Sequence, residues 1–588
     1  MPHHPTTDIA IVGASALFPG SVSDTGFWSD ILAGSDLTGP VPKEHWLIED
    51  YYDEDKSAPD MTYAKRGAFL DKVDFDAMSW GVPPSIVPAT DSAQLLALIV
   101  AQRVLEDAHG GQFKDADLSR TSVILGVTSA QELLGSMVSR LQHPIWRKAL
   151  RDAGLPESKV KECVERIRGE YTPWQESTFP GLLGNVVAGR IANRLDLGGT
   201  NCVTDAACAS AFSAVSMGVN ELHLGQSDLV ITGGVDTMND IFMYMCFSKT
   251  PALSPTGDCR PFSDRADGTL LGEGIGMVAL KRLADAERDG DTIYAVLKGV
   301  GASSDGRAKS VYAPRSSGQA KALTRAYDQA GYDISTVELV EAHGTGTKAG
   351  DAAEFGGLQS AFADVGVQKV ALGSVKSQIG HTKAAAGAAG LFKAVMALHH
   401  KTLPPTIKIE RPNPKLEIEK SAFYLNTAAR PWVRGSDHPR RAGVSSFGFG
   451  GSNFHLAVEE ATSHRAPRLR TGPSELLLFS GATKAELDSA IRAGKGRSWR
   501  RLSYELSQAF DASAGFRAAV VVTGGEELDA KLDKLVETLS KKDKANSPAG
   551  FSIGNGPVEG GVGFLFPGQG SQYVEMGATL AMNFTAAM

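Results

Sequence analysis

Short apolar runs alternate with longer helical patterns along most of this chain, and this alternation limits the folds that it can adopt. Helices are expected over residues 91–108, 206–224, 317–331 and 384–400, with apolar strands between them. Such strand–helix–strand repeats favour a mainly parallel sheet covered by helices. Because 588 residues with 42% hydrophobic side chains can fill several cores, the sequence predicts a large α/β fold with two halves.

Charge and cysteine usage exclude several classes of partner. No apolar run approaches the ~18 residues that span a bilayer, and the first residues lack the apolar core of a signal peptide. The five cysteines are few and show no framework spacing, which favours a reducing cytoplasm. A net charge of −8 argues against non-specific nucleic-acid binding. We therefore expect a cytoplasmic protein that binds neither membranes nor nucleic acid.

Cys208 lies where a β-prone segment, residues 201–204, runs into an Ala/Ser-rich helical stretch. A thiol at the N-terminus of a helix lies near unpaired N–H groups and the positive end of the helix dipole, and both favour the thiolate. The thiolate is the form of cysteine that attacks carbonyl carbon, so Cys208 is a candidate nucleophile. The alternative is a small buried side chain without a chemical role, as for most free cysteines.

Two histidines follow apolar runs later in the chain. His343 comes after residues 337–340, and His381 comes shortly after residues 370–375. Both runs resemble buried strands, and sites gather at the carboxyl edge of strands in open α/β sheets. Either histidine alone could be a hydrogen-bonded turn or core residue. A cysteine and two histidines at three strand ends indicate a catalytic group.

Three segments, TDAACAS, EAHGTGT and SVKSQIGH, contain the cysteine and the two histidines in this order. Together they resemble the Cys–His–His set of the β-ketoacyl synthases of the thiolase superfamily. Residues 8–20 are similar to the first strand and turn of these enzymes, and residues 444–453 to their glycine-rich C-terminal loop. The resemblance covers residues 8–460. It implies a duplicated, five-layer αβαβα thiolase-like fold that forms homodimers, with the cysteine on the first half and the histidines on the second.

Residue chemistry is consistent with a decarboxylating Claisen condensation. Cys208 can take an acyl group from a carrier thioester, which divides one difficult step into two easier ones. Neutral His343 and His381 can donate N–H bonds to the thioester oxygen of a malonyl unit as carbon dioxide leaves. The carbanion would then attack the acyl group on Cys208.

Supporting roles follow from the same resemblance. It implies an oxyanion hole made by the backbone N–H groups of Cys208 and Phe449, with Phe449 also gating the acyl pocket. It gives Lys376 a supporting role through a network with Glu354, and it places Asp351 in the shell around them.

The resemblance also implies the carrier of the substrates. Thr345 and Thr347 would hydrogen-bond the phosphopantetheine arm of an acyl carrier protein, although hydroxyls that bond their own turn are an alternative. No other cofactor is expected. The cysteines form no CxxC pair and the chain has no HExxH motif, while His399 and His400 are adjacent on a helix and cannot face one ion. We therefore predict that no metal is required.

Composition changes after residue 460. Residues 1–460 are predicted to be the synthase, and residues 461–560 to be a small α/β unit resembling the linker between ketosynthase and acyltransferase. Residues 561–588 resemble the first strand and loop of a malonyl-type acyltransferase, without a GxSxG nucleophile elbow. We expect no transferase activity from this fragment, and we interpret the chain as a piece of a longer synthase with further domains.

Segments at residues 45–70 and 90–96 look most like polyunsaturated fatty acid synthases. The nucleophile segment DAACASA departs from the DTACSSS pattern of modular polyketide synthases. An iterative polyunsaturated fatty acid synthase is thus preferred, and an iterative, enediyne-type polyketide synthase is the alternative. A decarboxylase or chain-length partner remains a further alternative, whereas a thiolase is disfavoured because two histidines accompany the cysteine. A charged insertion at residues 133–177 is expected to be helical.

Overall fold

The computed structural model describes residues 8–20, 24–128, 132–307, 310–433, 435, 437–463, 474–556 and 560–588. It separates into two compact units, Met1–Leu469 and Arg470–Met588. The larger unit is built on a sheet of 11 strands, and the smaller unit on a sheet of four.

The first half of the large sheet contains five strands in the spatial order β5-β4-β6-β8-β1. The first two pairings in this order are parallel and the next two are antiparallel. Every residue of the strands β1, β4 and β6 is buried. The strands are β1 (Ile9–Leu17), β4 (Thr121–Val127), β5 (Asn201–Thr204), β6 (Leu229–Asp236) and β8 (Gly274–Arg282).

The second half repeats this plan with the order β11-β10-β15-β16-β9, again with two parallel and then two antiparallel pairings. Numbered along the chain, both halves have the order third, second, fourth, fifth, first, so the predicted duplication is visible in the topology. β1 and β9 join the halves, and β13 (Phe423–Leu425) extends the second edge. The strands are β9 (Ala295–Ser304), β10 (Leu339–Glu341), β11 (Val370–Gly373), β15 (Arg441–Gly448) and β16 (Ser452–Glu460).

The expectation of a mainly parallel sheet is wrong, because the sheet is mixed. The connection between β15 and β16 shows the reason. Only residues 449–451 separate these two strands, and a turn this short joins antiparallel neighbours. A parallel step needs a crossover of a dozen or more residues.

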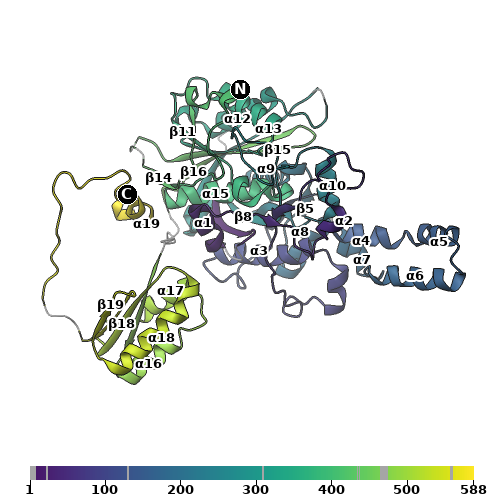
Figure 1. Ribbon diagram of the computed structural model, residues 1–588. Helices are drawn as coiled ribbons and strands as arrows, with labels where there is room; N and C mark the ends of the chain where they lie inside the picture. Colours follow the sequence, from purple (N-terminus) through teal and green to yellow (C-terminus); the bar gives the residue numbers. More distant parts are fainter. Residues whose placement is uncertain are drawn as a thin grey trace. The chain divides into compact units, whose positions relative to one another are not determined.

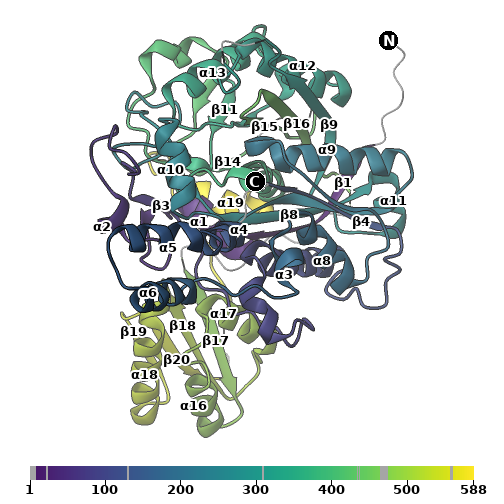
Figure 2. The same cartoon turned by 90° about the vertical axis from the view of Figure 1, so that its right-hand side faces the viewer.

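Helices complete the five layers (Figures 1 and 2). α9 (Ser210–His223) and α15 (Ala386–His400) pack against each other and against strands of both halves, and all residues of α15 are buried. A helix that is apolar on all sides belongs in such an interior layer. Outer layers are formed by α3 (Ser92–Ala108) with α8 (Asn185–Leu195) on the first half, and by α12 (Ser316–Ala330) with α13 (Lys348–Ala361) on the second. The predicted αβαβα thiolase-like fold is confirmed.

The insertion between β4 and β5 is helical, as predicted. It forms α4 (Glu132–Arg140), α5 (His143–Asp152) and α6 (Glu157–Gly169), and Figure 1 shows α5 and α6 projecting from the body of the large unit. α5 has no buried residue, and α6 buries Val160 and Val164. Further elements of this unit are α1 (Asp24–Ala33), α2 (Ile48–Tyr51), β2 (Gly39–Pro40), β3 (Arg66–Ala68), α7 (Thr178–Leu182), α10 (Ile241–Lys249), β7 (Leu271–Gly272), α11 (Leu283–Asp289), α14 (Lys376–Ile379), β12 (Thr402–Leu403) and β14 (Arg430–Pro431).

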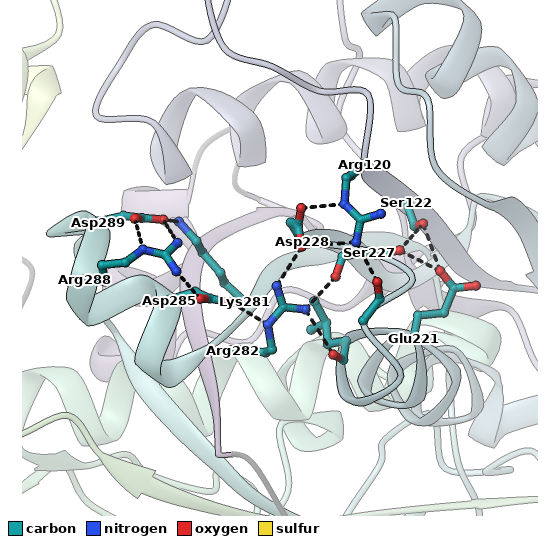
Figure 3. A network of polar contacts seen from close by, with 12 residues as sticks. Arg120, Ser122, Glu221, Ser227, Asp228, Lys281, Arg282, Asp285, Arg288 and Asp289 are labelled. Atoms are coloured by element: carbon teal, nitrogen blue, oxygen red, sulfur yellow. Dashed lines mark hydrogen bonds and ion pairs between the residues drawn. The ribbon is translucent and has the colours of Figure 1, made fainter.

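A charge network ties three strands together at their far ends (Figure 3). Asp228, just before β6, accepts hydrogen bonds from Arg120 Nε and Arg282 Nη2, each at 2.6 Å. Arg282, at the end of β8, also donates to the carbonyl oxygens of Ser227 at 2.8 Å and Leu222 at 3.1 Å. Arg120 precedes β4, so the network fixes the starts of β4 and β6 against the end of β8.

The small unit contains both helices and strands, as its predicted α/β character requires. Its sheet has the order β17-β18-β20-β19 with antiparallel pairing, and its core includes Leu477, Val520 and Leu532. The strands are β17 (Glu475–Gly481), β18 (Phe516–Val522), β19 (Ala545–Ser547) and β20 (Phe551–Asn555), and the helices are α16 (Lys484–Arg492), α17 (Trp499–Ala509) and α18 (Gly525–Lys541).

The strand expected near residues 563–566 is not formed. Described residues 560–577 contain no helix or strand, and α19 (Ala578–Asn583) follows them. Leu565 is 98% exposed and Phe566 is 90% exposed. A strand needs a neighbour for its backbone hydrogen bonds and a core for its apolar face, and in the described part of the chain residues 563–566 pair with no strand and are exposed.

Candidate active site

The nucleophile turn joins β5 to α9, as the sequence predicted. Ala207 has a φ of +51°, a left-handed conformation that residues with a side chain rarely adopt. Local hydrogen bonds hold it there: Ala207 N–H donates to Asp205 Oδ1 at 2.9 Å, and Ser210 Oγ donates to the Ala207 carbonyl at 2.6 Å. The next residue, Cys208, is 8% exposed, so the turn delivers its thiol into a nearly closed site.

The glycine-rich turn between β15 and β16 lies directly against Cys208. Ser446 Oγ donates to the Cys208 carbonyl at 2.8 Å, and the Phe449 N–H donates to the Cys208 sulfur. Gly448 permits this approach, because a Cβ atom there would lie 2.1 Å from the Ala206 carbonyl oxygen. One segment therefore holds both the backbone and the thiol of Cys208.

Burial raises the pKa of the Cys208 thiol to about 11, although the Lys376 charge and the Phe449 N–H both act to lower it. The prediction that the helix N-terminus favours the thiolate is therefore wrong for the free site. α9 begins only at Ser210, and Cys208 lies on the preceding 3₁₀ turn, Ala207–Ala209. Removing an anion from water outweighs the favourable charges around it.

His343 lies in the turn after β10, and its backbone is fixed by a buried carboxylate. The N–H groups of His343 and Gly344 each donate to Glu354 at 2.7 Å. The ring nitrogen Nδ1 accepts a hydrogen bond from the Phe447 N–H at 3.4 Å, which leaves the proton on Nε2. Burial, with the Lys376 charge, lowers the pKa of His343 well below its ordinary value, so the ring is neutral.

His381 shows the same arrangement from different partners. Its Nδ1 accepts a hydrogen bond from the Lys383 N–H at 3.1 Å, so its proton is also on Nε2. Burial, with the charges of Lys376 and Lys383, lowers the pKa of His381 well below its ordinary value. The two rings are 5.4 Å apart and nearly perpendicular. The site thus contains two neutral imidazoles, each able to donate from Nε2.

Lys376 begins α14 and is 3% exposed. Burial lowers the pKa of Lys376, while the charges of Glu341 and Glu354 act in the opposite direction. Its charge in turn affects the pKa of Cys208, His343 and His381. Lys376 therefore interacts electrostatically both with Glu354 and with the three predicted catalytic side chains, Cys208, His343 and His381.

Asp351 lies one helical turn before Glu354 and fixes a neighbouring part of the backbone. It accepts hydrogen bonds from the N–H groups of Phe262 at 2.7 Å and Gly346 at 3.0 Å. Burial raises the pKa of Asp351 to about 8 and that of Glu354 to about 7. Both carboxyl groups shape the His343 turn through its backbone.

Thr345 and Thr347 are brought together, with their hydroxyl oxygens 3.0 Å apart. Thr347 also caps α13, since its Oγ1 accepts a hydrogen bond from the Gly350 N–H at 3.2 Å. These contacts are the local turn bonding that the sequence left open as an alternative. Both side chains remain partly exposed, so binding of phosphopantetheine by them stays a prediction.

Phe449 is the most exposed of the predicted site residues, at 48%. Its ring lies 6.4 Å from that of Phe247 on α10 and 6.4 Å from that of Tyr312. Its backbone N–H reaches the Cys208 sulfur while its ring faces outward among aromatic side chains. This placement agrees with a residue at the entrance of the site.

Sequence reasoning missed three residues that support the site. Ser446 bonds the nucleophile turn, and Lys383 bonds both His381 and Asp236. A lysine in the Ala-rich run that follows His381 was the one signal available in the sequence. Asp236 lies at the end of β6, with no pattern to relate it to Lys383.

Among the residues that the structure describes, no three His, Cys, Asp or Glu side chains are grouped so that they could hold a metal ion. In the same residues, no helix has the length and apolar character needed to cross a membrane.

Comparisons with known proteins agree with this geometry. Residues 6–286 match the beta-ketoacyl synthase N-terminal domain, residues 294–410 the beta-ketoacyl synthase C-terminal domain, and residues 412–513 the ketoacyl-synthetase C-terminal extension. The ketosynthase from module 6 of the bacillaene synthase of Bacillus subtilis 168 aligns with a TM-score of 0.67 and 29% identity, over 93% of this chain and 87% of that one. The oxazolomycin ketosynthase domain OzmH KS7 of Streptomyces albus aligns with a TM-score of 0.69 and 28% identity, over 93% of this chain and 90% of that one.

Two sequence relatives are much longer than this chain. A polyunsaturated fatty acid synthase polypeptide from Thraustochytrium sp. is 38% identical over 98% of this chain, which spans 22% of that protein. Polyketide synthase GfsA from Streptomyces halstedii is 34% identical over 98% of this chain, which spans 7% of that protein.

A thiolase-like fold with a cysteine and two histidines at its centre defines a condensing enzyme. The chain belongs to the β-ketoacyl synthase family, among the ketosynthases of fatty acid and polyketide synthases.

Proposed function

We propose that this chain condenses an acyl group on Cys208 with a malonyl unit on an acyl carrier protein, as a step of polyunsaturated fatty acid synthesis. The observation that carries the proposal is the state of the two histidines. His343 and His381 are neutral and both have the proton on Nε2, which suits them to stabilise an enolate oxygen.

In the first step, the Cys208 sulfur attacks the thioester carbonyl of the acyl carrier. The carrier thiol leaves and takes up the proton that Cys208 loses. The thiol needs help to ionise because its pKa is about 11, and the Lys376 charge and the Phe449 N–H both favour the anion. The N–H groups of Cys208 and Phe449 would receive the oxyanion of the tetrahedral intermediate.

In the second step, malonyl thioester binds with its carbonyl oxygen at the Nε2 atoms of His343 and His381. Carbon dioxide leaves, and the two N–H groups hold the charge that develops on this oxygen. The carbanion attacks the acyl carbon, and Cys208 leaves as a thiolate that is reprotonated. Thr345 and Thr347 would bind the phosphopantetheine arm, and no other cofactor is needed.

The assignment to polyunsaturated fatty acid synthesis is supported by the 38% identity to the Thraustochytrium synthase and by the segments at residues 45–70 and 90–96. An iterative polyketide synthase is the second candidate, supported by the 34% identity to the Streptomyces polyketide synthase. In either case the enzyme would work in the cytoplasm with carrier domains and the other domains of a longer synthase.

Several finer assignments belong to the same proposal. Residues 1–460 are the synthase, residues 461–560 a linker toward an acyltransferase, and residues 561–588 the start of that acyltransferase. We also propose a homodimer. β5 is the terminal strand of the large sheet, pairs with β4, and leads directly to Cys208, so its outer edge is suited to pair with a second copy.

Intact-mass spectrometry after incubation with medium-chain acyl thioesters tests the central step. The wild type should gain the mass of one acyl group and Cys208→Ala should gain none. Acyl loading of Cys208→Ala would refute the nucleophile assignment. If neither protein is acylated, the decarboxylase or partner alternative is favoured, and the range of accepted acyl chains separates the fatty acid and polyketide candidates.

A further inference from the structure

Lys383 is a buried lysine beside the site that the condensation chemistry does not use. It is 3% exposed, and its ammonium group pairs with Asp236 Oδ1 at 3.0 Å. It also donates to the Gly272 carbonyl at 2.8 Å and to Asn239 Oδ1 at 3.2 Å. These three contacts use all three hydrogens of the ammonium group, so the side chain is held in one position.

The backbone of Lys383 has an unusual conformation at the same place. Its φ is +47°, in the left-handed region that favours glycine. This conformation directs its N–H to Nδ1 of His381, two residues earlier, at 3.1 Å. Strained backbone of this kind persists only where the surrounding structure holds it.

Asp236 connects the side chain to the backbone of this turn. Its Oδ1 pairs with the Lys383 ammonium, while its Oδ2 accepts a hydrogen bond from the Ala384 N–H at 3.2 Å. The carboxylate comes from the end of β6 in the first half of the fold, whereas the turn belongs to the second half. It is therefore an external support for the turn that carries His381.

We propose that Lys383 is a positioning residue for His381: its side chain, anchored by Asp236, holds the left-handed turn whose N–H bonds Nδ1 and thereby keeps the His381 proton on Nε2. The inference rests on the proposed role of His381 in decarboxylation. According to this inference, Lys383, which is not one of the Cys–His–His residues, determines the tautomer of His381.

Charge gives the pair a second effect. The charged and titratable groups that face His381 are Lys376 from α14, Lys383 from its own turn and the His343 ring from the turn after β10. Both lysines lower the pKa of His381, and burial acts in the same direction. Removing the Lys383 charge should therefore raise that pKa and let the ring gain a proton at a higher pH.

A purely structural role is the competing explanation, because removal of one partner from a buried ion pair destabilises many proteins. Arg440 and Glu460 provide a matched control. They form a buried pair at 3.0 Å, 5% and 3% exposed, between the start of β15 and the end of β16. Arg440→Met should lower stability as Lys383→Met does, without acting on His381.

The experiment measures two half-reactions separately, acylation of Cys208 and decarboxylation of malonyl thioester, each corrected for the folded fraction. For Lys383→Met we expect the rate of decarboxylation to fall about 10- to 100-fold. This decrease is no larger than the decrease of about 10²- to 10³-fold that removal of an oxyanion donor causes. Acylation should fall less than decarboxylation. Ser446 and Phe449 hold Cys208, and although the Lys383 charge acts to lower the pKa of the Cys208 thiol, Lys376 and the Phe449 N–H act more strongly and the Asp236 charge opposes it. The acid limb of the decarboxylation profile should move about one pH unit upward, since a nearby like charge shifts a pKa by that order.

Three comparisons make the result decisive. The double variant Asp236→Asn/Lys383→Met leaves no unpaired charge and should fold if the single variant does not. It should show the same loss of decarboxylation and a smaller upward pH shift, because the opposing charge of Asp236 is removed as well. Equal losses in both half-reactions, or an unchanged pH profile, would show a structural role and overturn the inference. His381→Ala is measured in parallel. If His381→Ala retains decarboxylation, the proposed role of His381 is wrong. If His381→Ala loses decarboxylation and Lys383→Met does not, only the proposed role of Lys383 is wrong.

Discussion

Ser446 offers a direct test of the contact between the glycine-rich turn and the nucleophile. Its side chain is completely buried, and its hydroxyl donates to the Cys208 carbonyl at 2.8 Å. Ser446→Ala removes this donor, so the Cys208 carbonyl loses the hydrogen bond from Ser446 at a position next to the strained residue Ala207. An unsatisfied buried polar group costs about 1–3 kcal/mol.

The same free energy limits the expected kinetic effect. If the Cys208 turn shifts, the sulfur leaves its position at the Phe449 N–H. The same free energy is then added to the activation barrier of acylation. A cost of 1–3 kcal/mol corresponds to a rate decrease of about 5- to 150-fold, because 1.36 kcal/mol is a factor of ten. We expect acylation by acyl thioester to slow by about 10- to 30-fold, with a free energy of unfolding lower by about 1–2 kcal/mol.

Time-resolved intact-mass spectrometry measures the acylation rate, and denaturant unfolding measures the stability. Ser213→Ala is the matched control: Ser213 is on α9, and its hydroxyl lies 3.0 Å from that of Thr204, whereas the hydroxyl on the Cys208 carbonyl is that of Ser446. It should lose some stability and keep its acylation rate. An acylation rate in Ser446→Ala equal to that of the wild type, together with the expected loss of stability, would refute the reasoning.

The remaining predictions concern the histidines and the charge network. His343→Ala and His381→Ala should each slow condensation by about 10²–10³, as for a lost oxyanion donor, and a near-normal product yield from either would remove that histidine from the mechanism. At the far strand ends, Arg120 and Arg282 lower the pKa of Asp228 to about 2. This carboxylate therefore stabilises the fold above its ordinary pKa, and the contribution is lost as pH falls through the lowered pKa. Because Asp228 is 50% exposed, Asp228→Asn should lower the free energy of unfolding at pH 7 by only about 0.5–1 kcal/mol, with the difference shrinking toward pH 2; equal stability at pH 7 would contradict this.

Local patterns predicted the elements of this fold well. The helix expected at residues 91–108 is α3, capped by Asp91, whose side chain accepts from the Ala93 N–H. The strand and helix on either side of Cys208 are also where the sequence placed them. These features depend on capping and on hydrophobic periodicity, which lie within a few residues of each other.

Strand direction and charge state could not be predicted in this way. The mixed sheet depends on which strands become neighbours, and β1, β8 and β9 meet from distant parts of the chain. The raised pKa of Cys208 depends on burial by both halves, which no local motif reports. For the same reason Lys383 gave only a weak signal, because its partner Asp236 belongs to the other half of the fold.

The duplication explains why the site forms where it does. Cys208 follows β5, the third strand of the first half, and His381 follows β11, the third strand of the second half. Each then leads into a central helix, α9 or α15, and these two helices pack together. Near each catalytic residue, one non-glycine residue has a left-handed backbone conformation: Ala207 next to Cys208, and Lys383 two residues after His381. Two equivalent strand-to-helix turns thus contact each other where the two central helices begin, and a left-handed residue in each directs the thiol in one half and the imidazole in the other.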